Sequence, residues 1–210
     1  MKMSNSLSQK VYDKLLGKIF DNQLPAGEII NRRAVADELN VSVAPVLEAM
    51  LMLEQDGLLE TLPRKGTRVV VIHKSDVAGH LFVREALEVY AARHICGQIV
   101  EEAGKELEAL ALRADNAPLH TLEYNKADID FHSALVSLCK CDFLDKEYSR
   151  VSRLGFFYRI NSFITSEQAE QRKNHIQLLD QLKINDPVNA QTSMRMHIVS
   201  GKGDLIISHE

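Results

Sequence analysis

The sequence predicts a mainly α-helical protein with two parts: an N-terminal winged helix-turn-helix over residues 1–74 and a C-terminal all-α antiparallel bundle of six to seven helices over residues 75–210. In the first part, short helical patterns are followed by two β-prone runs, "LLETL" and "GTRVVVI", on either side of a "PRKG" turn. The second part has helical periodicity and no strand pattern, which favours a helical bundle. A chain of 210 residues is long enough for both parts.

The first part contains three predicted helices. Residues 7–20 carry apolar side chains at helical spacing, so one face of this helix is expected to be buried. Pro25 and Gly27 end that helix, and a short amphipathic helix follows in "NRRAVADELN". After a turn at Asn40, the third helix begins with Ser42 as its N-cap. Three helices followed by a hairpin with a basic tip are typical of a winged helix-turn-helix.

The predicted helices of the bundle are punctuated by asparagine and proline. Their expected bounds are 76–98, 100–114, 118–140, 142–162, 166–184 and 187–206. The first of these helices and the aromatic-rich run "CDFLDKEYSRVSRLGFFYRI" are candidates for a dimer interface. Ordinary burial in the core explains the same aromatic residues equally well.

Composition and charge narrow the class of protein. Apolar residues make up 45% of the chain and charged residues 26%, which is typical of a folded globular protein. No apolar run reaches the roughly 18 residues that cross a bilayer, and the N-terminus lacks the apolar segment of a signal peptide, so a cytoplasmic protein is expected. Residues 1–74 contain ten Lys/Arg and nine Asp/Glu, against fifteen and twenty in the remainder. The net charge of −4 therefore comes from the second part, and the first can present a basic face.

Four residues of the bundle have the chemistry of a metal site. Asp128 and His132, in "DIDFH", lie on one face of a helix because they are four residues apart, with Cβ atoms about 5–6 Å apart. His175 and His197 occur on later helices beside apolar residues, so both can point into the bundle. Three imidazoles and a carboxylate suit zinc, nickel, manganese or iron and leave positions open for water or a ligand. Taken singly, each histidine is more often an ordinary hydrogen-bonded residue than a metal ligand.

Nearly the whole chain resembles a known family. The run "LPAGEIINRRAVADELNVSVAPVLEAMLMLEQDGLLETLPRKGTRVV" is similar to the DNA-binding motif of GntR-type transcriptional regulators, from its proline-glycine start to its "GT-x-V" wing. In the second part, "GHLFVREALEVYAAR" and "DIDFH" resemble the FCD effector domain of the FadR subfamily. The resemblance implies a homodimer that binds a pseudo-palindromic operator in double-stranded DNA.

The same resemblance implies a small effector, often a carboxylate, bound beside a divalent metal ion. The metal ligands of the family fall on Asp128, His132, His175 and His197, and zinc is the first choice of ion.

Two arginines are candidates for contact with the effector. Arg84, on the first bundle helix, is the better candidate for the carboxylate, and Arg159 is a weaker one. For Arg84 the alternative is a surface salt bridge with Glu85 or Glu88.

The resemblance fails where the recognition helix of the family usually carries arginine. Val43 and Leu47 stand at those positions, and neither can form the bidentate hydrogen bonds that arginine makes to guanine. They could instead contact thymine methyl groups and favour an A·T-rich operator. Arg33 matches an arginine of the family on the preceding helix, and Arg32 is its neighbour.

Other groups could bind the DNA backbone or the minor groove. Ser42 and the helix N-terminus can hold a phosphate. Arg64, Lys65 and Arg68 form a basic tip where a wing meets the minor groove. Reading of DNA shape by these cations is an alternative source of specificity. The remaining possibility is that sequence-specific DNA binding has been lost.

The resulting hypothesis is a ligand-responsive transcriptional repressor that is not an enzyme. One alternative is a metal-responsive regulator, in which the ion itself is the signal. Another is a metal-dependent hydrolase or binding protein whose DNA specificity has been lost. Against the hydrolase, the sequence offers no positioned general base beyond the predicted ligands and no nucleophile motif.

Overall fold

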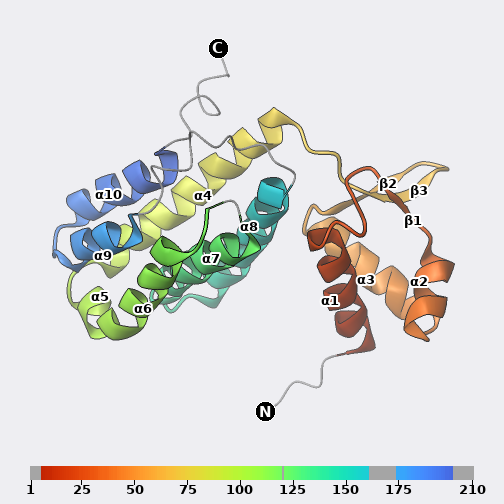
Figure 1. Ribbon diagram of the computed structural model, residues 1–210, viewed down its shortest axis with the longest axis horizontal. Coiled ribbons are helices and arrows are strands. Elements are labelled where there is room, and N and C mark those ends of the chain that lie inside the picture. The colour runs from red at the N-terminus through yellow and green to blue at the C-terminus, as the bar shows by residue number, and fades with distance from the viewer. Residues whose placement is uncertain (1–5, 120, 161–173, 201–210) are drawn as a thin grey trace. The chain divides into compact units, whose positions relative to one another are not determined.

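The computed structural model describes residues 6–119, 121–160 and 174–200. The chain divides into two compact units, Met1–Ile72 and His73–Glu210. Figure 1 shows helices and a small sheet in the first unit and helices throughout the described part of the second. The predicted fold class, a winged helix-turn-helix followed by a helical bundle, is confirmed. No helix within the described ranges is long and apolar enough to cross a bilayer.

The N-terminal unit contains a three-stranded sheet beside its helices. The elements are α1 (Leu7–Phe20), β1 (Ile29–Ile30), α2 (Arg32–Leu39), α3 (Val43–Gln55), β2 (Leu59–Leu62) and β3 (Gly66–Val69). β2 and β3 form the predicted hairpin, and β1 pairs antiparallel with the other edge of β3. The sequence does not predict β1, because a strand of two residues is too short to show an alternating pattern.

The core of the N-terminal unit lies between α1 and α3. Five side chains of these two helices are almost completely buried: Leu15, Ile19, Val46, Ala49 and Leu53. The turn between α2 and α3 passes through Asn40, whose φ of 52° is left-handed, a conformation that asparagine tolerates better than most residues. Packing on α1 therefore buries one side of α3 and leaves another side exposed.

The second unit consists of helices in its described part. They are α4 (Lys74–Ile95), α5 (Gln98–Glu102), α6 (Gly104–Asn116), α7 (Leu122–Ser137), α8 (Asp142–Ile160), α9 (His175–Lys183) and α10 (Pro187–Val199). The predicted helix over 76–98 ends earlier, because Gly97 takes a φ of 80° and a Cβ there would lie 2.9 Å from Cβ of Asn185. The predicted helix over 100–114 is two helices, α5 and α6. Parts of the predicted helices 166–184 and 187–206 lie outside the described residues.

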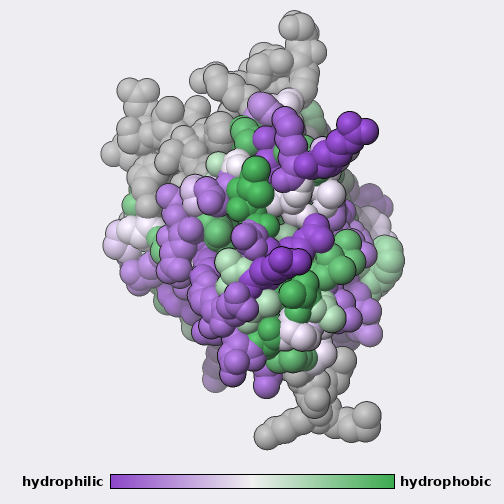
Figure 2. Space-filling model, turned by 90° about the vertical axis from the view of Figure 1, so that its right-hand side faces the viewer, coloured by the Kyte–Doolittle hydropathy of each residue, from purple (hydrophilic) through white to green (hydrophobic). Residues whose placement is uncertain are grey.

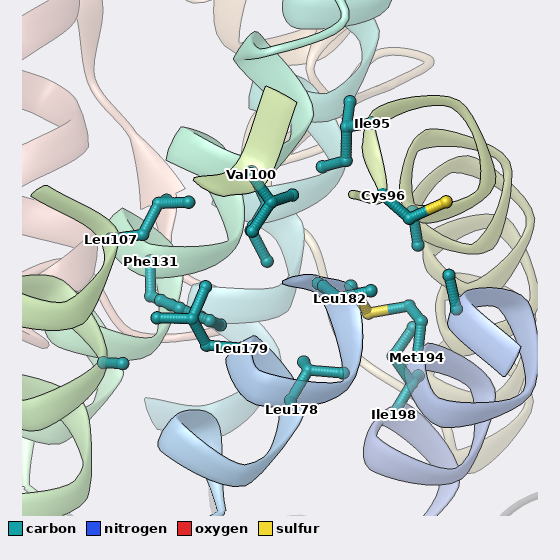
Figure 3. Packing of buried hydrophobic residues seen from close by; sticks show 14 residues of the cluster. Ile95, Cys96, Val100, Leu107, Phe131, Leu178, Leu179, Leu182, Met194 and Ile198 are labelled. Atoms are coloured by element: carbon teal, nitrogen blue, oxygen red, sulfur yellow. The ribbon is translucent and has the colours of Figure 1, made fainter. Parts of the chain in front are cut away.

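Side chains from six of these helices form one apolar core (Figure 3). Ile95 of α4, Val100 of α5, Leu107 of α6, Phe131 of α7, Leu179 of α9 and Ile198 of α10 belong to this core. Figure 3 shows Phe131 beside Leu107 and Leu179. The ring of Phe131 lies 5.2 Å from that of His132 and 5.1 Å from that of His175, measured between centroids. The predicted metal ligands therefore border the main core rather than the surface.

Candidate metal centre and DNA-binding face

Two of the four predicted metal ligands lie on α7. The helix begins after Thr121, whose hydroxyl accepts a hydrogen bond from the backbone N–H of Tyr124 at 3.1 Å. Asp128 and His132 are four residues apart, about one helical turn, and therefore share a face of α7. Both are buried, with exposed fractions of 5% and 0%.

α9 and α10 bring two more histidines to the same point. The Nε2 atoms of His132 and His197 are 3.0 Å apart, and Nε2 of His175 is 3.3 Å from Oδ1 of Asp128. The same Oδ1 lies 3.9 Å from Nε2 of His132. One ring nitrogen from each of the three histidines lies within 4.8 Å of the others. Residues from three helices therefore share one cluster of donor atoms.

The geometry of this donor set fits a divalent metal ion. A zinc–nitrogen bond is about 2.0–2.1 Å long, so two ligand atoms on one ion are separated by about 3.0–3.5 Å. The separations of 3.0 Å and 3.3 Å agree with that spacing. Two imidazole nitrogens that face each other also need a proton or an ion between them, since two lone pairs repel.

Glu88 of α4 lies directly behind His132. Its Oε2 atom is 2.7 Å from Nδ1 of His132, on the side of the ring that faces away from the cluster. Its Oε1 atom accepts hydrogen bonds from the Tyr148 hydroxyl, at 2.7 Å, and from Nε of Arg84. Burial alone raises the pKa of Glu88, but the positive charge of Arg84 and the interaction with His132 outweigh it and hold the pKa well below its usual range. The carboxylate is thus ionised although it is completely buried.

Asp115 of α6 lies against Nδ1 of His175, as Glu88 lies against Nδ1 of His132. Nδ1 of His175 lies 2.7 Å from Oδ1 of Asp115. The backbone N–H groups of His175 and Ile176 also donate to this carboxylate, at 3.0 and 3.1 Å. Asp115 therefore holds both the first turn of α9 and the ring that α9 carries.

Burial and neighbouring charges set the ionisation of the three histidines. Burial, followed by the charges of His132 and His175, lowers the pKa of His197 well below its usual range. Burial is also the main cause of the lowered pKa of His132. Burial opposes the charged form of His175 as well, but hydrogen bonds to Asp115 and Asp128 outweigh it and raise the pKa. Metals bind neutral imidazole, so the lowered pKa values of His132 and His197 favour the form that a ligand requires.

Arg84 lies beside the cluster and is buried, so the surface salt bridge considered from the sequence is not what the structure contains. Its partner is Glu88, and its Nη1 atom is 3.7 Å from Oδ2 of Asp128. Burial lowers the pKa of Arg84, but these two carboxylates outweigh it and raise the pKa, which keeps the guanidinium charged. The side chain of Arg159, the other predicted effector contact, lies outside the described residues.

The two arginines at the start of α2 have different surroundings. Arg33 is exposed, and within the described ranges its guanidinium has no hydrogen-bond or salt-bridge partner. Nη2 of Arg32 donates to the hydroxyl of Thr67 at 3.2 Å, which ties α2 to β3. Arg33 is therefore available to an external ligand, whereas Arg32 is engaged within the unit.

The exposed surface of α3 carries an apolar stripe, beside the polar Glu48 and Gln55. Val43, Leu47 and Leu51 follow one another at intervals of four residues and are 43%, 39% and 50% exposed. α3 contains no lysine or arginine, and Leu51 extends the stripe beyond the two positions identified from the sequence. Figure 2 shows one face of the molecule, on which hydrophobic residues lie among hydrophilic ones. Ser42 precedes the stripe as N-cap, but its exposed side chain makes no capping hydrogen bond.

The wing carries its cations in two different settings. Arg64 and Lys65 are exposed in the turn between β2 and β3, where Arg64 has a left-handed φ of 62°. Arg68 faces Glu60 across the hairpin, and its Nε atom lies 2.9 Å from Oε1 of that residue. The positive charge of Arg68 is thus partly neutralised, while the charges at the tip are open to solvent.

Several residues of these sites are not identified from the sequence. They are Glu88, Asp115 and Tyr148 in the helical unit and Leu51 on α3. The spacing of four residues between Arg84 and Glu88 signals a contact along one helix. No comparable signal exists for Asp115, because only the docking of α9 against α6 brings it to His175.

Solved structures share this fold. A GntR transcriptional regulator from Rhodococcus sp. RHA1 superimposes with a TM-score of 0.74 at 18% identity, over 97% of this chain and 99% of that one. Escherichia coli McbR/YncC gives a TM-score of 0.69 at 21% identity, over 98% and 99% of the two chains. At such identities the likeness shows the fold alone.

Relatives also match along most of the chain. YdhC, an HTH-type transcriptional regulator of Bacillus subtilis (strain 168), is 28% identical over 191 residues, which cover 89% of this chain and 85% of the relative. The HTH-type transcriptional repressor RspR of Escherichia coli (strain K12) is 24% identical over 200 residues, covering 91% and 86%.

Two family profiles match successive parts of the chain. "Bacterial regulatory proteins, gntR family" matches residues 7–69, and the FCD domain matches residues 80–200. The first match contains α2, α3 and the wing, and the second contains the histidine cluster. The chain belongs to the GntR family of bacterial DNA-binding transcriptional regulators, as a member with an FCD domain.

Proposed function

We propose that this regulator is a repressor whose affinity for its operator depends on a small carboxylate bound at a metal ion in the helical unit. The observation that carries the proposal is the convergence of three histidines, with Asp128 beside two of them, at the edge of an apolar core. Core packing alone does not require three imidazole nitrogens within 4.8 Å of one another. Repression is favoured because RspR is a repressor.

The proposed ion is divalent, with zinc as the first choice and nickel, manganese or iron as alternatives. Asp128, His132, His175 and His197 would hold it. A bound ion supplies a positive centre with coordination positions open to a carboxylate oxygen. We assign a second contact with the carboxylate to Arg84, which lies beside the cluster with Nη1 3.7 Å from Oδ2 of Asp128.

A homodimer gives the ligand a route to DNA. An effector that prefers one arrangement of the helices biases the orientation of the two DNA-binding units in the dimer. Because operator half-sites have a fixed spacing, a small reorientation changes affinity. Of the two interface candidates, α4 exposes Phe82, Val83 and Tyr90, whereas α8 exposes Phe143 in its first turn and buries Phe156 and Phe157. The exposed apolar side of α4 is thus the better candidate.

On the DNA side, we assign phosphate or groove contacts to Arg33, Ser42, Arg64 and Lys65. The apolar stripe of α3, formed by Val43, Leu47 and Leu51, would lie against thymine methyl groups in the major groove. A valine or leucine cannot satisfy the polar edge of guanine, so an A·T-rich operator is expected.

A binding selection with genomic DNA fragments tests both halves of the proposal. Metal-loaded protein is compared with the variant Asp128→Ala/His132→Ala, with and without a panel of small carboxylates. Enrichment of a two-fold symmetric, A·T-rich site that a carboxylate releases only from the metal-loaded protein is the expected result. If the metal ion changes DNA binding by the protein without any carboxylate, the protein is a metal-responsive regulator instead. Failure of the folded, metal-bound protein to enrich any site at low salt would overturn the DNA assignment.

A further inference from the structure

We infer that Glu88 and Asp115 are positioning residues for the metal centre, each fixing one imidazole so that its Nε2 atom faces the shared donor cluster. The inference rests on the proposed metal site. Neither residue belongs to the predicted ligand set, and each lies on a different helix from the histidine that it holds.

The two carboxylates solve the same chemical problem. A neutral imidazole has one nitrogen that donates and one that carries a lone pair, and the partner of the donor decides which is which. A carboxylate behind Nδ1 keeps the proton there and leaves the lone pair on Nε2. Nδ1 of His132 lies 2.7 Å from Glu88, and Nδ1 of His175 lies 2.7 Å from Asp115.

Both carboxylates are themselves held in place. Oε1 of Glu88 receives hydrogen bonds from Arg84 and from the Tyr148 hydroxyl, so Oε2 remains directed at His132. Asp115 accepts the two backbone N–H groups at the start of α9, which fixes the carboxylate relative to His175. The rings therefore have little rotational freedom before any ion arrives.

His197 provides an internal contrast. Its Nδ1 atom is buried, and within the described residues it has neither a hydrogen bond nor an ion pair with a carboxylate. Nδ1 of His132 also lacks a hydrogen bond of good geometry, but it lies 2.7 Å from Oε2 of Glu88. The structure thus distinguishes two histidines whose rear nitrogens face a carboxylate from a third that is set by packing and by its contact with His132.

The test exchanges each carboxylate for its amide. In Glu88→Gln and Asp115→Asn the shape is nearly kept, but an amide N–H₂ can face Nδ1 and shift the proton to Nε2, where it blocks the ion. Zinc affinity of the full-length protein, measured by competition with a chromophoric chelator, should fall by about 10- to 100-fold in each variant. Visible absorption of the Co²⁺-loaded protein should change in intensity, since it reports the coordination geometry.

Asp130→Asn is the matched control. Asp130 lies on α7 with His132, but it is exposed and pairs with Arg113. Its zinc affinity should equal that of the wild type. Circular dichroism in the presence of EDTA tests whether each variant folds without metal. This measurement separates a loss of ligand orientation from a loss of structure.

A measurement on the unaltered protein covers the case of an unfolded variant. Long-range proton–nitrogen correlations of ¹⁵N-histidine in the zinc-loaded wild type should show His132 and His175 protonated at Nδ1. Protonation at Nε2 with metal at Nδ1 in either residue would overturn the inference, as would folded variants whose zinc affinity stays within about twofold of the wild type, well below the usual effect of outer partners. If the wild type binds no divalent metal, the proposed function itself fails, and the inference falls with it.

Discussion

The donor cluster of the helical unit and the exposed face of α3 treat polar groups in opposite ways. In the cluster, charged and polar side chains are buried, and most face a partner. Glu88, for example, contacts three: Arg84, Tyr148 and His132. On α3 the exposed stripe of Val43, Leu47 and Leu51 is apolar and meets solvent, although the helix belongs to a DNA-binding family. Each region departs from the ordinary rule that apolar residues lie inside and polar residues outside.

The difference indicates what each region binds. A buried polar cluster is stable only when its groups are satisfied, so its geometry is fixed in advance and suits a small ion or ligand. An exposed apolar stripe costs little on a surface and gains only when another surface covers it. The helical site is therefore expected to discriminate by geometry, and α3 by shape and apolar contact.

The largest expected effect is on the buried cluster. His132→Ala should weaken zinc binding by more than about a hundredfold, above the range of outer partners, because it removes a ligand outright. The exposed histidine of α4, in His94→Ala, is the control and should leave the affinity unchanged. Equilibrium competition with a chelator gives both values. Equal affinities for the two variants would remove the contrast between the regions.

On the DNA-binding unit, Arg33→Ala should have the largest effect. Operator affinity is expected to fall at least about tenfold, the loss of one good contact to DNA. Lys105→Ala alters an exposed cation in the helical unit and serves as control. Fluorescence anisotropy with a labelled operator is the measurement. An unchanged dissociation constant for Arg33→Ala would exclude this residue as a main contact.

Removing methyl groups from the operator tests the apolar stripe. Replacing a contacted thymine by deoxyuridine should weaken binding about fourfold, from about 0.8 kcal/mol for each buried methyl or methylene group. The variant Val43→Ala/Leu47→Ala should bind the thymine and deoxyuridine operators alike. Replacement of thymines outside the protected region is the control. Wild-type protein that ignores every deoxyuridine would refute methyl contacts and favour reading of DNA shape.

The smallest expected effect concerns the wing. The plot of log affinity against log salt concentration has a negative slope. Lys65→Ala should make this slope less steep by about 1, as expected for one lost phosphate contact. Arg68→Ala should change the slope less, because Glu60 already neutralises Arg68 in part. Titrations at several salt concentrations compare them. A larger change for Arg68→Ala would show that its ion pair breaks on DNA.

Local pattern is sufficient for much of this molecule. Helical spacing, the proline and glycine breaks and the turn at Asn40 predict α1, α2 and α3, since each depends on residues near in sequence. The four-residue spacing of Asp128 and His132 likewise places both on one face of α7 before any tertiary contact is known. The positions of Val43 and Leu47 on α3 can also be predicted from the sequence, because they follow from the register of the helix.

Tertiary structure decided the remainder. β1 exists only because β3 offers it an edge, and the break at Gly97 depends on the close approach of Asn185. Asp115 has no spacing relation to His175, and the 2.7 Å contact between them arises from the packing of α6 against α9. The sequence by itself determined which residue types and helix faces were available, because those follow from local periodicity. The contacts that orient the histidines required the fold, because they join atoms that only long-range packing brings together.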